Sequence, residues 1–304
     1  MVNQECSVTV AGEDVRITSP DKMMFPRQGW TKWEVVQHFV TCVDGALTGV
    51  FGRPTMLKRW PNGAGAKPFF QKRAPASAVE RIRVDYPSGR SARWLVPRSP
   101  ADIIWMAQLN CLDLNPWTSR AEHLEIPDEL RVDLDPTPEA TFADVREVAL
   151  VVRDVLDDHD LVGWPKTSGA SGMHIYVRIA PEWGFADVRR AALALGRAVE
   201  DEIPHLATTA WWKEDRHGVF VDYNQNTRDH TIASAYSVRP TGFVSAPLRW
   251  DEVGSAEPAD FPMVGFAERY LAVGDLTDGI DDAVGRLDSL LELADQQDAE
   301  RGEG

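Results

Sequence analysis

The order of the expected elements is the feature that most restricts what this chain of 304 residues can fold into. Short alternating runs predict strands at 7–17, 131–136, 174–179 and 218–223, and a clear apolar stripe predicts a helix at 186–203. Strands and helices do not follow one another as a regular series of βαβ units. We therefore expect an α+β fold with antiparallel or mixed sheets.

Local signals predict several boundaries. Thr31 with Glu34 three residues later is typical of a capping box, and Thr141 is in place to cap another helix. Residues 101–112 have the pattern of a short helix. A β-hairpin is expected at 81–96, turning at Pro87-Ser88-Gly89.

The charge is distributed unevenly along the chain. The net charge is −15, yet residues 51–100 contain eleven Lys and Arg against two acids, which makes that segment +9 and the rest −24. A basic segment in an acidic protein indicates a localised site for a polyanion, and the acidic remainder limits non-specific binding. The alternative is a solvated basic face.

Several classes of protein are disfavoured by composition. No apolar run approaches the ~18 residues of a membrane helix, and the first residues, MVNQECSVTV, lack the pattern of a secretory signal. Cys6, Cys42 and Cys111 are far apart and odd in number, which argues against a disulfide framework. We expect a cytoplasmic protein.

Three acids are candidate metal ligands. Asp133 and Asp135 are two residues apart on an expected strand, so both carboxylates lie on one face, and Asp222 ends another apolar strand. Three carboxylates at strand ends can hold two divalent cations for phosphoryl transfer. Taken alone, the DxD pair and Asp222 are each more typical of acids in a solvated turn.

The segment between these acids is a candidate anion site. Residues 166–174 (KTSGASGMH) offer serines, glycines with free N–H groups, and His174 at the start of a strand. The GK[ST] of a phosphate-binding P-loop is missing. A flexible loop with a core histidine is the alternative.

Cations and aromatic residues are mixed in the basic segment. Lys58 begins KRWPNG, and Phe69 and Phe70 follow shortly after. Exposed aromatic rings can stack on bases while cations hold phosphates. The alternative is that the phenylalanines belong to the core, although adjacent strand positions would normally place only one of them inside.

Together these motifs resemble a known family. The set is DKxxFP (21–26), KRWPNG (58–63), FF (69–70), VDLDP (132–136), KTSGxxGxH (166–174), VFVDxxQN (219–226) and YSVR (236–239). It is similar to the polymerase domain of bacterial ligase D, in the archaeo-eukaryotic primase-polymerase superfamily. CLDLNPW (111–117), WWKE (211–214) and SAPLRWDEV (245–253) are more similar to the stand-alone primase-polymerase associated with ligase C.

The resemblance implies a role for individual residues. Asp133, Asp135 and Asp222 match the catalytic, metal-binding acids. Two further groups match contacts to the incoming nucleotide (Lys58, Ser168, His174, Arg216, Gln225 and Arg239) and to DNA (Phe69 and Phe70 beside the template base, Lys22 and Lys32 at a recessed 5′ phosphate).

Two nucleotide-site positions depart from the family pattern. Ser171 stands where the relatives have Lys or Arg, and Asn115 where ligase D polymerases have His. Loss of a cation should weaken triphosphate binding unless Lys166 or Lys213 compensates. The departures concern nucleotide affinity and sugar preference, not the type of reaction.

The resemblance also implies an organisation and an activity. We expect one domain of two interlocked modules, an N-terminal one at about 1–115 and a catalytic one at about 116–280. From the residues themselves, the acidic C-terminal tail (281–304) is expected to contain one helix at 284–294, followed by a polar end that frays. The implied reaction adds NTPs or dNTPs to a 3′ hydroxyl at gaps or broken DNA ends, with Mn²⁺ favoured over Mg²⁺ and ribonucleotides favoured.

The resemblance also implies partners. This sequence contains no ligase motif, so an ATP-dependent DNA ligase would act in trans, and the end-binding protein Ku is a further candidate partner. No membrane partner is expected.

Two other functions remain as alternatives. DLDPT at 133–137 with GDLTD at 274–278 matches the acidic motifs of haloacid-dehalogenase-type phosphatases, in which Asp133 would be the nucleophile. That motif normally follows the first strand of a Rossmann-like domain and leaves the basic segment without a role. A non-catalytic module that bridges DNA ends is the second alternative.

Overall fold

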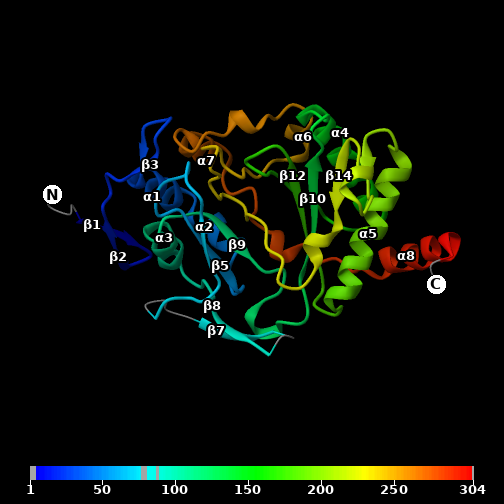
Figure 1. Ribbon diagram of the computed structural model, residues 1–304, viewed down its shortest axis with the longest axis horizontal. Helices are drawn as coiled ribbons and strands as arrows, with labels where there is room; N and C mark the ends of the chain where they lie inside the picture. Colours follow the sequence, from blue (N-terminus) through cyan, green and yellow to red (C-terminus); the bar gives the residue numbers. More distant parts are fainter. Residues whose placement is uncertain (1–4, 77–80, 87–88, 303–304) are drawn as a thin grey trace. The chain divides into compact units, whose positions relative to one another are not determined.

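The computed structural model describes residues 5–76, 81–86 and 89–302, and its backbone divides into two compact units. Unit 1 comprises Met1–Trp117, Thr231–Ala246 and Pro258–Asp278. Unit 2 comprises Thr118–His230, Pro247–Glu257 and Gly279–Gly304. Each unit is described by itself below, with the labels of Figure 1.

The units differ in membership from the modules that we expected. Residues 231–246 and 258–278 belong with the N-terminal segment rather than with the catalytic one. The reason is backbone hydrogen bonding, because Ser234 N donates to Leu114 O at 2.8 Å and Val238 N to Leu112 O at 2.8 Å. That the whole chain acts as a single domain stays a prediction.

Unit 1 is built on a sheet with strand order β6-β5-β8-β7, in which β9 also pairs with β5. Its strands are β1 (Glu5–Val10), β2 (Glu13–Thr18), β3 (Met23–Phe25), β4 (Trp30–Thr31), β5 (Thr55–Arg59), β6 (Phe69–Gln71), β7 (Arg81–Asp85), β8 (Ser91–Leu95) and β9 (Cys111–Pro116). Its helices are α1 (Lys32–Thr41), α2 (Val43–Thr48), α3 (Pro100–Gln108) and α7 (Phe266–Val273). The capping box predicted at Thr31 and Glu34 is confirmed.

Two predictions in this unit need correction or qualification. The helix expected at 101–112 ends at Gln108, and Cys111–Pro116 forms β9 instead, because its side chains are buried along the strand and its backbone pairs with β5. The hairpin is present as antiparallel β7 and β8. Residues 87–88 of its expected turn lie outside the described residues.

Unit 2 contains a mixed sheet with strand order β11-β12-β10-β14-β13. Its strands are β10 (Glu129–Pro136), β11 (Trp164–Thr167), β12 (Met173–Arg178), β13 (Ala207–Thr208) and β14 (Val219–Asp222), and its helices are α4 (Phe142–Asp158), α5 (Phe185–Glu202), α6 (Trp250–Val253) and α8 (Asp288–Arg301). β10 is antiparallel to β12 and β14, and only β13 and β14 pair in parallel in this sheet. The predicted α+β class is confirmed.

Helices α4 and α5 pack against each other and against β10 (Figure 1). The cap predicted at Thr141 is confirmed: its hydroxyl and backbone both bond Asp144. On β10, Val132 and Leu134 are buried, and the alternating positions carry the acids. The helices therefore fix which face of the sheet is apolar and which is free for chemistry.

The C-terminal prediction was wrong in its boundaries. The last helix starts at Asp288 rather than 284 and continues to Arg301, through most of the segment that we expected to fray. It packs against α5, where Asp298 accepts hydrogen bonds from Arg190 and Arg197. These contacts order a polar segment whose sequence alone has no clear apolar stripe.

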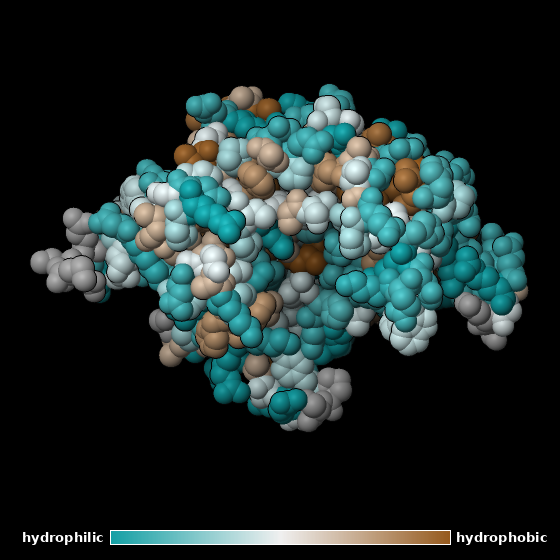
Figure 2. All heavy atoms as spheres, turned by 45° about the horizontal axis from the view of Figure 1, so that its top comes forward, coloured by the Kyte–Doolittle hydropathy of each residue, from teal (hydrophilic) through white to brown (hydrophobic). Residues whose placement is uncertain are grey.

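Hydrophilic residues predominate on the face drawn in Figure 2, and hydrophobic ones lie there in separate small patches. Across the described residues, no helix is both long enough and apolar enough to cross a membrane.

Candidate metal centre and nucleotide-binding residues

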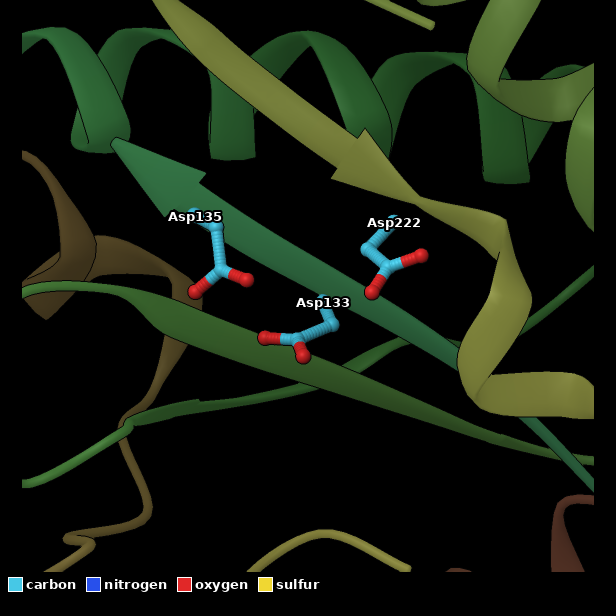
Figure 3. Close-up of side chains that lie close together, drawn as sticks. All are labelled: Asp133, Asp135 and Asp222. Carbon is cyan, nitrogen blue, oxygen red and sulfur yellow. The ribbon is translucent and has the colours of Figure 1, made fainter. Parts of the chain in front are cut away.

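Three carboxylates meet on the polar face of the unit 2 sheet. Asp133 and Asp135 project from β10, and Asp222, at the end of β14, is the direct cross-strand partner of Asp133. One carboxylate oxygen from each of the three lies within 4.8 Å of the others. Figure 3 shows the side chains converging on the side of the sheet turned away from the helix behind it.

This donor set fits a hard divalent cation. Three like charges this close repel, and Asp133 is only 5% exposed, so water screens it little. A cation held by several carboxylate oxygens removes the repulsion, and oxygen ligands suit Mg²⁺ and Mn²⁺. The acids predicted from spacing thus lie together as a candidate metal centre.

The geometry does not support the phosphatase alternative. β10 pairs antiparallel with both of its neighbours, unlike the parallel strands of a Rossmann-like sheet. The late acidic motif is in unit 1, where Asp275 accepts hydrogen bonds from the Tyr236 hydroxyl at 2.6 Å and from Thr277. Asp275 thus stabilises a local turn.

His174 lies beside the centre in a defined orientation. On β12 it is opposite Asp133, with its Nε2 3.3 Å from Asp133 Oδ1. Its Nδ1 is 2.6 Å from Lys166 Nζ. An ammonium can only donate, so Nδ1 accepts and Nε2 carries the proton that faces Asp133.

Lys166, one of the two cations that could compensate for the neutral Ser171, contacts His174 in this structure. It is 2% exposed on β11, bonded to His174, and lies 5.0 Å from the centroid of the Tyr176 ring. Ser171 is exposed in the loop that follows β11. The other cation that could compensate, Lys213, is exposed and lines a cavity that also contains Asp135.

The loop at 168–172 contains internal hydrogen bonds that we did not expect. Ser168 Oγ accepts hydrogen bonds from the backbone N–H groups of Ala170 and Gly172, both at 3.1 Å. Two of the N–H groups expected to hold an anion are thus used within the loop. A Cβ at Gly172 would lie 2.2 Å from Leu134 O, so only glycine allows the loop to approach β10 this closely.

A second part of unit 2 presents cations next to Asp135. A cavity of about 370 Å³ is lined by Asp135, Thr137, Lys213 and Arg216, among others. The Arg216 guanidinium lies 3.4 Å from the centroid of the Phe220 ring and donates to Ala210 O at 3.1 Å. Both contacts hold the cation in place at the wall of this cavity.

Gln225 contacts one acid of the candidate metal centre in this structure. Its Nε2 donates to Asp222 Oδ2 at 3.2 Å, and Asn224 N donates to Asp222 Oδ1 at 2.9 Å. These bonds orient the Asp222 carboxylate. The nucleotide contact that the resemblance implied for Gln225 stays a prediction.

The remaining predicted nucleotide-site residues belong to unit 1. Lys58 Nζ pairs at 2.6 Å with Asp113, whose side chain is fully buried, and Asn115 Nδ2 donates to Asp113 O at 3.0 Å. Arg239 is half-buried, and its Nε has no hydrogen-bond partner within the described part of the chain. Asp113, which orients Lys58, was not identified from the sequence, although its alternation within CLDLNP was the available signal.

Phe69 and Phe70 are both on the surface of unit 1. Adjacent on β6, they are 55% and 54% exposed, so neither joins the core. Lys58 Nζ lies 5.8 Å from the centroid of the Phe70 ring. Exposed rings next to a cation are suited to stacking on bases.

Lys22 and Lys32 form one cationic cluster with Arg59, which sequence reasoning missed. Burial lowers the pKa of Lys32 to about 8, and repulsion from Lys22 and Arg59 acts in the same direction. Burial and Arg59 likewise lower the pKa of Lys22. Lys32 Nζ is held by Thr18 O at 2.9 Å and Gln108 Oε1 at 2.7 Å. Gathered cations of this kind are suited to bind an anion.

Comparison with known proteins gives consistent matches. The family model described as LigD, primase-polymerase domain, matches residues 31–277. The multifunctional non-homologous end joining protein LigD of Mycolicibacterium smegmatis is 31% identical over 299 residues, covering 95% of this chain and 39% of that protein. The bifunctional LigD of Bacillus subtilis is 28% identical over 266 residues, covering 86% of this chain and 43% of that protein.

A solved structure is similar over most of the chain. The polymerase domain from Mycobacterium tuberculosis ligase D in complex with DNA superposes with a TM-score of 0.81 at 30% identity. The match covers 88% of this chain and 98% of that one. The chain thus spans less than half the length of the LigD relatives above, and the part that it matches is similar to a polymerase domain.

Proposed function

We propose that this chain, which belongs to the family of LigD primase-polymerase domains, adds nucleoside monophosphates from NTPs or dNTPs to a 3′ hydroxyl at gaps or broken ends of DNA. The predicted family is confirmed; the closer likeness to the ligase C-associated enzymes stays a prediction. The observation that carries the proposal is the convergence of Asp133, Asp135 and Asp222 on adjacent strands.

The residues of unit 2 suggest how the transfer would proceed. Bound to the three carboxylates, two divalent cations would activate the 3′ hydroxyl and offset charge on the leaving group. The 3′ oxygen bonds to the α-phosphorus and its proton passes to solvent. The bond from that phosphorus to the bridging oxygen breaks, and pyrophosphate leaves with the electron pair. His174 holds its Nε2 proton toward the centre, and Arg216 presents a fixed positive charge beside Asp135.

The metal and the sugar are part of the proposal. An all-oxygen donor set admits both Mn²⁺ and Mg²⁺, and the family resemblance favours Mn²⁺ and ribonucleotides. The proposed partners are gapped or broken DNA with a 5′ phosphate, an ATP-dependent DNA ligase in trans, and Ku. We place the proposed activity at the nucleoid in the cytoplasm.

Primer extension across a short gap tests the proposal. A labelled primer is annealed to a template with a downstream strand that does or does not carry a 5′ phosphate, and each metal is combined with each sugar. We expect templated incorporation, fastest with Mn²⁺ and ribonucleotides. Absence of incorporation under every combination, or incorporation that ignores the template base, would overturn it.

Removal of two lysines should abolish the preference for a 5′ phosphate. Charge-assisted hydrogen bonds contribute on the order of 1.5–3 kcal/mol, so the Lys22→Ala, Lys32→Ala protein should lose roughly a 10- to 150-fold difference in affinity between the two gaps. Fluorescence anisotropy with each gap measures it. Because Lys32 is buried, Lys22→Ala with Arg59→Gln is tested in parallel. A preference that survives in both double variants would contradict the site.

This preference should also depend on pH. The pKa of Lys32 is lowered to about 8, so its positive charge is present below that pH and is lost as the pH rises through it. A phosphate monoester stays a dianion over the same range, since its second pKa is about 6. We therefore expect the ratio of affinities to fall between pH 7 and pH 9. A ratio that is constant across this range would argue against a role for Lys32.

A further inference from the structure

A cavity of about 330 Å³ in unit 1 is lined mainly by arginines, and no residue of the sites described above contributes to it. Its lining residues are Arg73, Ala74, Arg81, Arg83, Ser91, Ala92 and Arg93. Four arginines thus line one small cavity in a chain whose net charge is −15.

The hairpin of β7 and β8 builds this cavity. Arg81 and Arg83 are two residues apart on β7 and share one face, and Arg83 is directly opposite Arg93 on β8. The segment before the hairpin is held against β8 because Ala74 N donates to Arg93 O at 2.7 Å. This bond brings Arg73 to the same cavity.

The charges in the cavity are poorly balanced by the protein. Arg83 pairs with Asp85 at 2.9 Å, but both side chains are more than 65% exposed, so the pair contributes little. Arg73, Arg81 and Arg93 form no ion pair with any residue that the structure describes. Like charges directly opposite on paired strands destabilise a hairpin. The arrangement therefore opposes the stability of the fold, which is typical of a binding site.

We propose that this arginine cavity binds the phosphodiester backbone of DNA, as a contact separate from the metal centre. Guanidinium groups match phosphate oxygens with paired hydrogen bonds and stay charged at any physiological pH. Along β7 the Cα atoms of Arg81 and Arg83 are about 6.7 Å apart, so the two side chains can each reach a different phosphate of one DNA strand. The identity of the ligand rests on the proposed function, because DNA is the polyanion that a polymerase must hold.

The salt dependence of DNA binding tests the cavity directly. Binding of labelled gapped duplex is measured by anisotropy at several salt concentrations, with Asp133→Ala as the parent so that no turnover occurs. The cavity variant combines Arg73→Gln, Arg81→Gln and Arg93→Gln in one chain. In this triple variant the slope of log K against log [salt] should become shallower by about 2 to 3, at about 0.9 for each lost phosphate contact.

The control triple variant removes the same charge from arginines that already have a carboxylate partner. Arg16 pairs with Glu5, Arg153 with Asp154 and Arg286 with Glu182. Their replacement by Gln should change the slope by less than about 1. Equal changes in both triple variants would show a general charge effect and overturn the proposal, as would an unchanged slope in the cavity variant.

Stability in the absence of DNA gives a second readout. Because Arg93 opposes Arg83, Arg93→Gln should leave the Tm unchanged or raise it at low salt, whereas loss of a structural residue would lower it. A lowered Tm, or a poly-glutamate peptide that competes as well as DNA, would overturn the proposal, the latter in favour of an acidic protein partner. Failure of the proposed function is recognised separately, as absence of extension by the native chain.

Discussion

Replacement of any one of the three acids should abolish primer extension. We expect Asp133→Ala, Asp135→Ala and Asp222→Ala each to lower the extension rate by about 10³-fold or more, because metal ions contribute several kcal/mol of transition-state stabilisation and one carboxylate oxygen from each acid lies within 4.8 Å of the others. DNA affinity should stay within about twofold, because phosphate contacts supply most of it. Single-turnover extension with Mn²⁺ and anisotropy measure the two quantities.

Asp154→Ala is the matched control, since it removes an exposed carboxylate from α4 of the same unit. It should leave extension unchanged. Near-normal extension by one of the three variants would remove that acid from the metal centre. If the native chain bridged DNA ends but neither it nor any variant extended a primer, the non-catalytic alternative would be favoured.

The largest expected loss of stability comes from Glu129, which lies on the same strand as two of the acids. Glu129 accepts a hydrogen bond from Arg131 Nε at 2.7 Å and pairs with Arg178, and all three side chains are at most 2% exposed. Glu129→Gln removes the carboxylate that two buried guanidinium groups share, and Arg178 keeps its pair with Asp281. Breaking a buried pair in this way costs about 3–5 kcal/mol in free energy of unfolding.

Urea denaturation measures this loss. The control is Glu182→Gln, which breaks the ion pair between Glu182 and Arg286. These two side chains are 50% and 58% exposed, so the change should cost less than about 1 kcal/mol in free energy of unfolding. A cost below about 1 kcal/mol for Glu129→Gln would contradict this prediction. It would mean that Asp281, which also pairs with Arg178, or water replaces the lost carboxylate. At intermediate urea, extension should fall in parallel with unfolding of the variant.

Local pattern was sufficient to predict several elements and one part of the site. The predicted capping box at Thr31 and the predicted cap at Thr141 both involve a residue three positions further on, so the sequence contains both partners. The same holds for Asp133 and Asp135, because a period of two places both on one face of any strand. Where the pattern was weak the predictions failed: the helix expected to start at 284 starts at Asp288, since its contacts with α5 decide its boundaries.

Other features of the site depend on pairing between distant segments. The sequence contains Asp133, His174 and Asp222, but only the strand order β12-β10-β14 makes both of the others cross-strand neighbours of Asp133. That order is set by burial of the whole sheet and its helices, not by any local signal.

The sequence by itself thus determined the family, the α+β class and the three acids of the candidate metal centre, because each of these was predicted from residue types within short local motifs. The tertiary structure alone decided which charges meet: Lys166 with His174, Asp113 with Lys58, Arg59 with the two lysines, and Arg83 with Arg93. The physical reason is that electrostatic interaction depends on distance and burial, and for most of these pairs both are set by folding.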